Sequence, residues 1–221
     1  LVQMLTEEND AVIVNTPVYY PFLDAVKNNH RTLICSDLKN ENGIYTIDFE
    51  DFEKKIIEHN VKLFILCSPH NPAGRVWKKE ELKRLFEICK KHHVFVVSDE
   101  IHQDLVFGEN KHIPSLSIGD YDDMMVSIAA ASKTFNIAGA QNSMVIIPDK
   151  KLRKKWDAYT KGNRIQGGNT FGYVAAQAAY AGGKEWLDQV LKQIDENYRY
   201  LKAELAEKMP EAIVTPLEGT Y

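Results

Sequence analysis

Asn71, Asp99 and Lys133 each follow an apolar segment of the chain, and each has a side chain that could take part in chemistry. A lysine at the end of a buried run is rarely enclosed unless it is paired or chemically used. When desolvation lowers its pKa, such a lysine is suited to Schiff-base formation. Each residue also has an ordinary explanation, because Asn71 could form a turn between prolines, Asp99 could cap the next turn, and Lys133 could lie on the surface. The chemical interpretation therefore depends on whether the fold brings the three together.

The elements that must position these residues can be predicted from the apolar pattern. Short apolar runs predict strands at residues 11–14, 32–35, 62–67, 94–98, 126–131 and 143–147. Amphipathic or capped segments predict helices at residues 19–26, 48–57, 78–92, 149–159, 170–181 and 184–209. We expect the Ala-rich helix 170–181 to be buried and residues 36–43 to form a polar loop. The last helix would be a strut between domains, about 39 Å long.

The alternation of strands and helices predicts the fold class. Strands that alternate with helices form a largely parallel α/β sheet with helices on both faces, which is a three-layer α/β/α arrangement. In such sheets, ligands bind at the carboxyl ends of the strands. If the three strands belong to one sheet, Asn71, Asp99 and Lys133 face one crevice.

Composition narrows the class of protein. The 221 residues include 44% hydrophobic and 26% charged residues with a net charge of −4, which is the balance of a soluble globular protein with no nucleic-acid or membrane partner. No apolar run reaches the roughly 18 residues of a membrane span. Cys35, Cys67 and Cys89 are widely spaced and fit reduced thiols in the cytoplasm. His102 and Asp104 could form a metal pair, but nothing completes a site, so we expect no metal.

Three motifs together resemble a known enzyme family. Ser-Pro-His-Asn-Pro-Ala-Gly at 68–74, Ser-Asp-Glu-Ile-His at 98–102 and Ser-Lys-Thr-Phe-Asn at 132–136 match, in order and separation, the fold-type I pyridoxal-phosphate enzymes. This group is the aspartate aminotransferase superfamily, or aminotransferase class I/II, and the resemblance runs along the whole chain. Asp-Glu-Ile-His, Arg-Val-Trp at 75–77 and His-Ile-Pro at 112–114 are most similar to the MalY/PatB subgroup of cystathionine β-lyase-like proteins.

The resemblance implies a fold and a cofactor. The fold would be the large domain of aspartate aminotransferase, and the cofactor would be pyridoxal 5′-phosphate. Lys133 would form the internal aldimine and, once displaced by the substrate, would move the Cα proton. Asp99 would pair with the pyridine nitrogen and keep it protonated, so that the ring acts as an electron sink. Asn71 would donate to the ring oxygen O3′.

The resemblance implies three further contacts to the cofactor. His102 stands where many aminotransferases have a tyrosine for O3′, and histidine at this position resembles the lyase subgroup. Tyr19 would lie over the ring face, although Tyr20 beside it leaves the assignment ambiguous. Ser132 would hold the phosphate through its hydroxyl group.

The chain also departs from the common aminotransferase pattern. Gln141 replaces an arginine and Ala130 replaces a small Gly or Ser. An amide is a weaker phosphate ligand than the charged fork of an arginine. The MalY/PatB subgroup also tends to lack this arginine, so the departure favours a lyase.

Three functions remain open from the sequence. The first is a C–S β-lyase that converts cystathionine or a similar cysteine S-conjugate into a thiol, pyruvate and ammonia. The second is an aminotransferase of amino acids, and the third is a regulatory protein that retains the fold. The resemblance also implies a homodimer, with residues 1–209 as the cofactor-binding large domain and residues 210–221 as the start of a small domain. We expect the N-terminal start of the large domain and most of the small domain to lie outside the chain.

Overall fold

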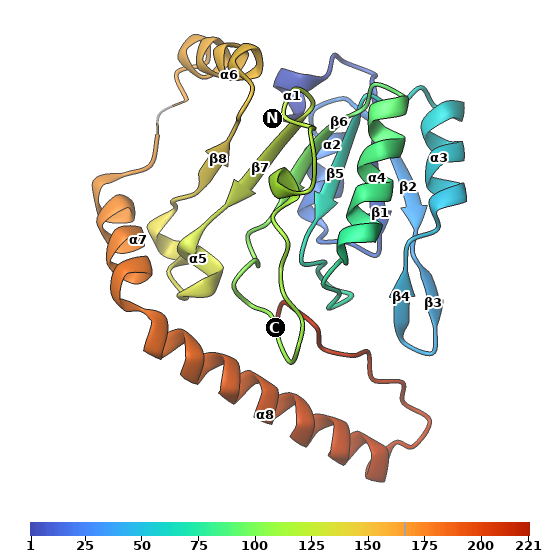
Figure 1. The fold of residues 1–221 in the computed structure, drawn as a ribbon, viewed down its shortest axis with the longest axis vertical. Coiled ribbons are helices and arrows are strands. Elements are labelled where there is room, and N and C mark those ends of the chain that lie inside the picture. Colours follow the sequence, from blue (N-terminus) through green and yellow to red (C-terminus); the bar gives the residue numbers. More distant parts are fainter. Residues whose placement is uncertain (166) are drawn as a thin grey trace.

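A six-stranded sheet lies at the centre of the computed structural model, which describes residues 1–165 and 167–221 (Figure 1). The strand order is β2-β1-β5-β6-β7-β8. The strands are β1 (Ala11–Thr16), β2 (Thr32–Asp37), β5 (Leu63–Cys67), β6 (Phe95–Asp99), β7 (Met125–Ala129) and β8 (Met144–Ile146). The first five are parallel and β8 is antiparallel to β7. The mostly parallel α/β sheet predicted from the sequence is therefore confirmed.

Eight α-helices are assigned in the described residues. They are α1 (Val2–Leu5), α2 (Pro21–Lys27), α3 (Phe49–Glu58), α4 (Lys79–Lys91), α5 (Ala131–Thr134), α6 (Lys150–Gly162), α7 (Thr170–Gly182) and α8 (Lys184–Lys208). Two helix starts are capped as the sequence predicts. Asp48 accepts a hydrogen bond from the Asp51 amide (3.2 Å), and Asp149 accepts from the amides of Lys151 and Leu152 (2.8 Å each).

Two hydrophobic cores lie on opposite faces of the sheet. On β1, Ile13 packs into a core with residues of α3 and α4, whereas Val12 and Val14 pack into a core with residues of α1, α2 and α6. Alternate residues of a strand point to opposite faces, so a strand covered on both faces has a continuous apolar sequence. This double burial explains why β5 reads Leu-Phe-Ile-Leu-Cys without a polar residue. The two cores also hold in place the sheet that positions Asn71, Asp99 and Lys133.

The prediction of a polar loop at residues 36–43 is wrong. β2 continues to Asp37, and β3 (Lys39–Glu41) pairs with β4 (Ile44–Thr46) as an antiparallel hairpin. Asn42 and Gly43 form its two-residue turn, and both have positive φ, at 53° and 84°. Asn-Gly is the preferred pair for such a turn because both positions need left-handed backbone.

The prediction that the strand at residues 126–131 ends at residue 131 is also wrong. β7 ends at Ala129, and Ala131 begins the short helix α5. Ser132 and Lys133 therefore lie in a helical turn rather than directly after a strand.

The C-terminal helices differ most from expectation. We predicted that helix 170–181 is buried, but in α7 only Gly172 is buried, and Phe171 is 85% exposed. α8 forms as predicted, yet none of its residues is buried. It extends away from the sheet, and the chain then returns so that the C-terminus lies close to the sheet body (Figure 1). No helix among the described residues is long and apolar enough to cross a membrane.

Candidate active site

A pocket of about 80 Å³ lies at the carboxyl ends of β5, β6 and β7, which are neighbours in the sheet. Its lining consists of Tyr19, Phe22, Cys67, Asn71, Asp99, Ile101, His102 and Lys133. Five of the six residues expected from the sequence therefore line one pocket. Strand register explains the convergence, because Cys67 pairs with Asp99 and Asp99 pairs with Ile128. The three strands thus end side by side.

Lys133 reaches the pocket from α5. Ala130 is extended, with φ −156° and ψ 148°, and the helical turn begins immediately after it. The turn is fixed by its buried residues Ala131 and Thr134 and by a hydrogen bond from the Thr134 hydroxyl to Asp104 (2.8 Å). Lys133 itself is half-buried. Its amine is therefore held at a covered site but remains open to the pocket.

Asp99 is the acidic group of the pocket. Its Oδ1 accepts a hydrogen bond from the Ile101 amide (3.1 Å). Burial raises the pKa of Asp99 to about 6, and the charge of Glu100 adds to this, while the Ile101 amide and Lys133 act in the opposite direction. A cation placed against this carboxylate would favour its ionised form. A protonated pyridine nitrogen is such a cation.

His102 contributes a ring nitrogen that is free to bind. Its buried Nδ1 has no hydrogen-bond partner among the described residues. Burial lowers the pKa of His102 to about 4, with a contribution from Lys133, so the ring is neutral near pH 7. A buried polar atom without a partner is costly. This atom is therefore suited to a hydrogen bond with a bound molecule.

Asn71 lies in a loop that is closed by its own backbone. The His70 amide donates to the Arg75 carbonyl (2.8 Å), and the Gly74 amide donates to the His70 carbonyl (2.9 Å). The backbone N–H of Asn71 donates to the Cys67 sulfur at 3.4 Å. Gly74 has φ +66°, and a Cβ there would lie 3.2 Å from the Pro216 carbonyl oxygen, so glycine is required. The loop holds the Asn71 side chain at the pocket.

Tyr19 and Tyr20 differ in their position relative to the pocket. Tyr19 lines the pocket and is 42% exposed, whereas Tyr20 is 69% exposed and is absent from the lining. Tyr19 precedes α2, and its ring packs edge-on against Phe22 at 6.1 Å between centroids. Helix 19–26 was expected to include Tyr19, but α2 begins at Pro21. Tyr19 therefore projects from the loop before the helix.

Ser132 lines a second pocket of about 300 Å³, which shares Lys133 with the first. The other residues that line this 300 Å³ pocket are Leu105, Thr134, Asn136, Ala138, Trp186, Val190, Ile194 and Tyr221. Tyr221 was missed from the sequence because no local motif connects it with Lys133. Phe22, Cys67 and Ile101 were also missed, although Cys67 pairs with Asp99 in the sheet and Ile101 directly precedes His102. Burial raises the pKa of Cys67 to about 12, so it remains a thiol.

The residues of the first pocket fit pyridoxal phosphate. Among the described residues, Asp99 lacks a strong cationic partner and the Nδ1 of His102 lacks any hydrogen-bond partner, while Lys133 supplies an amine. Ser132 offers a hydroxyl for a phosphate beside Lys133. Gln141 is exposed and has left-handed backbone, with φ 48° and ψ 52°.

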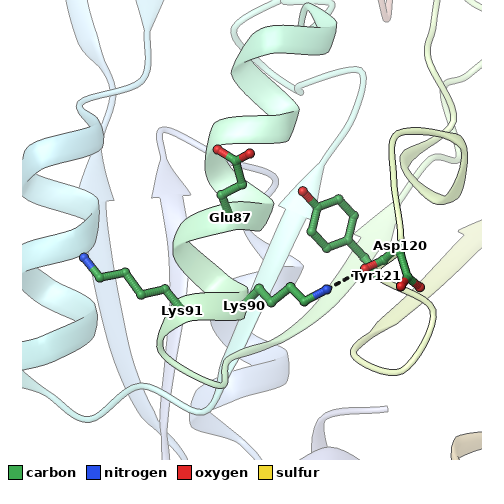
Figure 2. Close-up of a pocket in the computed structure, with 5 residues that line it drawn as sticks. All are labelled: Glu87, Lys90, Lys91, Asp120 and Tyr121. Carbon is green, nitrogen blue, oxygen red and sulfur yellow. Dashed lines mark hydrogen bonds between the residues drawn. The ribbon is translucent and has the colours of Figure 1, made fainter.

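A larger hollow of about 360 Å³ lies elsewhere, between the C-terminal end of α4 and the segment 120–121 (Figure 2). Lys90 crosses it, donating to the Asp120 carbonyl (2.9 Å) and lying 5.4 Å from the Tyr121 ring centroid. These contacts satisfy Lys90, and the hollow is at the opposite ends of the strands from Lys133. The geometry therefore favours the strand-end pocket as the active site.

Comparison with known proteins agrees with the motifs. The family model for aminotransferase class I and II matches residues 1–221. Cystathionine beta-lyase PatB of Bacillus subtilis is 44% identical over the whole chain and 57% of its own length. Protein MalY of Escherichia coli is 31% identical over the whole chain and 56% of its own length. The chain therefore spans little more than half the length of these relatives, and its resemblance to the MalY/PatB subgroup is confirmed.

Solved structures show the same fold. A PLP-bound putative aminotransferase from Clostridium difficile 630 has a TM-score of 0.94 and 46% identity, covering 99% of this chain and 56% of that one. A PLP-bound C-S lyase from Staphylococcus hominis has a TM-score of 0.93 and 38% identity, covering 99% of this chain and 54% of that one. The sheet is thus that of PLP fold-type I. With motifs, fold and family model in agreement along its whole length, the chain belongs to the class I and II aminotransferase family.

Proposed function

We propose that the complete protein is a pyridoxal-phosphate-dependent C–S β-lyase. It would take cystathionine or a similar cysteine S-conjugate and produce a thiol, pyruvate and ammonia. The observation that carries this proposal is the convergence of Lys133, Asp99 and Asn71 on one pocket. The 44% identity to a cystathionine beta-lyase supports the lyase reaction in particular.

Lys133 and Asp99 would carry the proton chemistry. Nζ of Lys133 would hold the cofactor and, once the substrate has replaced it, would remove the proton from the substrate Cα. The carboxylate of Asp99 would hold a proton on the pyridine nitrogen. When bound, pyridoxal phosphate supplies an electron sink for the negative charge left on Cα.

The other four residues of the site would orient the bound molecules. The Asn71 side-chain amide would donate to the ring oxygen, and His102 would make a second hydrogen bond on that side. Tyr19 would cover the ring face and exclude water from it. The Ser132 hydroxyl would donate to the phosphate.

The overall reaction balances without an added oxidant or reductant. The Cα–H bond breaks and its proton goes to Lys133, after which the Cβ–S bond breaks and its electron pair leaves with sulfur. The thiolate takes up a proton to become the thiol. The three-carbon remainder takes up one water molecule and is released as pyruvate and ammonia. No keto acid is consumed.

The test is to incubate the full-length protein with cystathionine and pyridoxal phosphate, without a keto acid, and to assay free thiol and pyruvate. We expect both products in equal amounts. The Lys133→Ala variant should yield neither, whereas Lys150→Ala, which changes an exposed lysine on α6, should behave as the wild type. No thiol, together with amino transfer to a keto acid, would refute the lyase and support an aminotransferase.

An aminotransferase is the second candidate. It is favoured by the similarity to the putative aminotransferase from Clostridium difficile 630. The same residues would remove the Cα proton, but Lys133 would then give that proton up again and no group would leave from Cβ. The two reactions would share one site, and the leaving group on the substrate Cβ would decide between them.

We further propose a cytoplasmic homodimer in which residues 1–209 serve as the large domain and residues 210–221 begin a small domain. Free cysteines support the location, because Cys35, Cys67 and Cys89 form no disulfide. Exposed aromatic residues on α7, Phe171 at 85% and Tyr173 at 54%, support an interface. Sedimentation of the full-length protein should give twice the mass of one full-length polypeptide. The mass of a single polypeptide would contradict the dimer.

A further inference from the structure

Arg75 is a buried cation at the end of the Asn71 loop. It is only 6% exposed. Its Nη2 donates to both carboxylate oxygens of Glu81, at 3.2 and 3.1 Å, and its Nε donates to Glu218 at 2.9 Å. Nη1 donates to the Tyr45 carbonyl, and the guanidinium lies 4.8 Å from the Trp77 ring centroid. A buried charge needs such partners, so Arg75 holds several segments together.

The two carboxylates that bind Arg75 differ in what they connect. Glu81 lies in the first turn of α4 and also accepts from the Lys78 amide (2.8 Å), so its contacts join Arg75 only to the nearby helix start. Glu218 is 143 residues away from Arg75 in the chain. The Oε2 of Glu218 also accepts from the Val76 amide (2.9 Å). Of the two carboxylates, therefore, only that of Glu218 connects the C-terminal segment to the Asn71 loop.

The backbone of residues 218–220 lies between the two loops of the candidate active site. The amides of Glu218 and Gly219 donate to the Gly74 carbonyl, at 3.0 and 2.9 Å. On the other side, the Phe107 amide donates to the Glu218 carbonyl and the Thr220 amide to the Leu105 carbonyl, both at 2.9 Å. This segment thus joins the loop after β5, which carries Asn71, to the loop after β6, which carries His102.

Tyr221 follows directly and lies beside His102. Its ring centroid lies 5.7 Å from that of His102, and it lines the 300 Å³ pocket together with Lys133. That pocket has apolar side chains, including Leu105, Val190 and Ile194. The first pocket holds five of the six residues expected to bind the cofactor. Ser132, the expected phosphate ligand, lines the second pocket, so the apolar side chains there offer space beside the phosphate for the rest of an amino-acid substrate at Lys133.

We propose that Arg75 and Glu218 are positioning residues that hold Tyr221 beside Lys133, where Tyr221 forms a wall for the S-substituent of a thioether amino acid. This inference deepens the proposed function and rests on it for the substrate class. Tyr221 would contact the substrate, whereas the ion pair would act through Tyr221. The apolar wall would favour bulky S-substituents over small ones.

The test uses the full-length protein with bound pyridoxal phosphate and two inert ligands, α-methyl-S-benzylcysteine and α-methyl-S-methylcysteine. Neither has a Cα proton, so binding can be measured from the visible spectrum without turnover. We expect Tyr221→Ala to weaken binding of the benzyl ligand about tenfold and to leave the methyl ligand nearly unchanged. Equal effects on both ligands would overturn the role of Tyr221.

The two carboxylates provide a matched pair. Glu218→Gln and Glu81→Gln each remove one charged partner of Arg75, and each should lower the melting temperature by a few degrees. Only Glu218→Gln should reproduce the selective loss of benzyl binding. The double variant Glu218→Gln/Tyr221→Ala should bind no more weakly than Tyr221→Ala alone, because Glu218 acts through Tyr221. Additive losses, or equal selectivity changes in the two single variants, would overturn the positioning role.

These outcomes are separable from failure of the proposed function. If thiol release from cystathionine fails but the benzyl selectivity depends on Tyr221 and Glu218, the wall stands and only the reaction is wrong. If Glu218→Gln does not fold, Tyr221→Ala still tests the wall, because this side chain is 67% exposed and outside both cores.

Discussion

The central sheet and the C-terminal helices contrast in how they use apolar residues. All five residues of β5 are buried, whereas none of the 25 residues of α8 is. α8 is instead supported locally by i,i+4 ion pairs such as Lys184–Asp188 and Arg199–Asp195, each worth only about 0.3–0.5 kcal/mol. The sheet body is therefore held by packing, and the helical extension by its own backbone and surface pairs.

This contrast matters for function because the candidate active site lies where the two regions meet. Asn71, Asp99 and Lys133 are fixed by the packed sheet, while Trp186 and Val190 of α8 line the neighbouring pocket. If the proposed function holds, the chemistry is placed on the packed sheet and the substrate space beside the helical extension. The following experiments test this division, in order of decreasing effect.

Replacing Lys133 by alanine should have the largest effect. Without the amine, the full-length protein should lose its yellow colour with pyridoxal phosphate, and turnover should fall by about 10²-fold to 10⁴-fold or more, because proton removal from Cα is lost. A visible spectrum and a thiol assay measure the two effects. An unchanged visible spectrum would refute the assignment of the lysine.

A pair of core and surface truncations tests the packing contrast. Phe64→Ala on β5, where the side chain is fully buried, should lower the free energy of unfolding by about 3–5 kcal/mol. Leu201→Ala on α8, where the side chain is 52% exposed, should change it by less than about 0.5 kcal/mol. Urea denaturation of the 221-residue chain measures both. If Leu201→Ala greatly lowers the free energy of unfolding only in the full-length protein, other segments of that protein must cover α8.

Asp99→Asn should stabilise the cofactor-free protein. Burial raises the Asp99 pKa from 3.8 to about 6, so the folded state disfavours the ionised carboxylate. The resulting destabilisation is absent below pH 3.8, grows between pH 3.8 and about 6, and is complete above that. The variant should therefore be more stable than wild type at pH 7.5, by on the order of 2 kcal/mol, and the difference should shrink as the pH falls toward 4.

Thermal melting between pH 4.5 and 8 measures this difference, with Asp122→Asn on the surface as control. With pyridoxal phosphate present, the order should reverse, because the carboxylate then pairs with the ring nitrogen. A stability difference that does not change with pH would contradict the assigned pKa.

Removing the cap of α6 should have the smallest effect. Asp149 accepts from two backbone amides at the helix start. Asp149→Ala should cost about 1 kcal/mol in the free energy of unfolding, whereas Asp149→Ser, which preserves an acceptor, should cost less. Equal losses would mean that the charge at the helix N-terminus, rather than the hydrogen bonds, stabilises α6.

Much of the fold could be predicted because its signals are local. Strand positions followed from continuous apolar runs, and the starts of α3 and α6 followed from Asp48 and Asp149. The Asn42–Gly43 turn was also readable, although the segment was assigned to a loop. The exposure of α7 was not readable, because an alanine-rich sequence forms a helix with or without a covering partner.

The sequence by itself determined which side chains lie at or beyond the carboxyl ends of β5, β6 and β7, and therefore which residues could meet at one end of the sheet. It also indicated the family, since each of the three motifs is a continuous stretch of the chain. Only the tertiary structure decided that Tyr19 rather than Tyr20 lines the pocket, and that Glu218 pairs with Arg75 across 143 residues. Periodicity and motifs encode local structure, whereas contacts between distant segments depend on how packing closes the long loops between them.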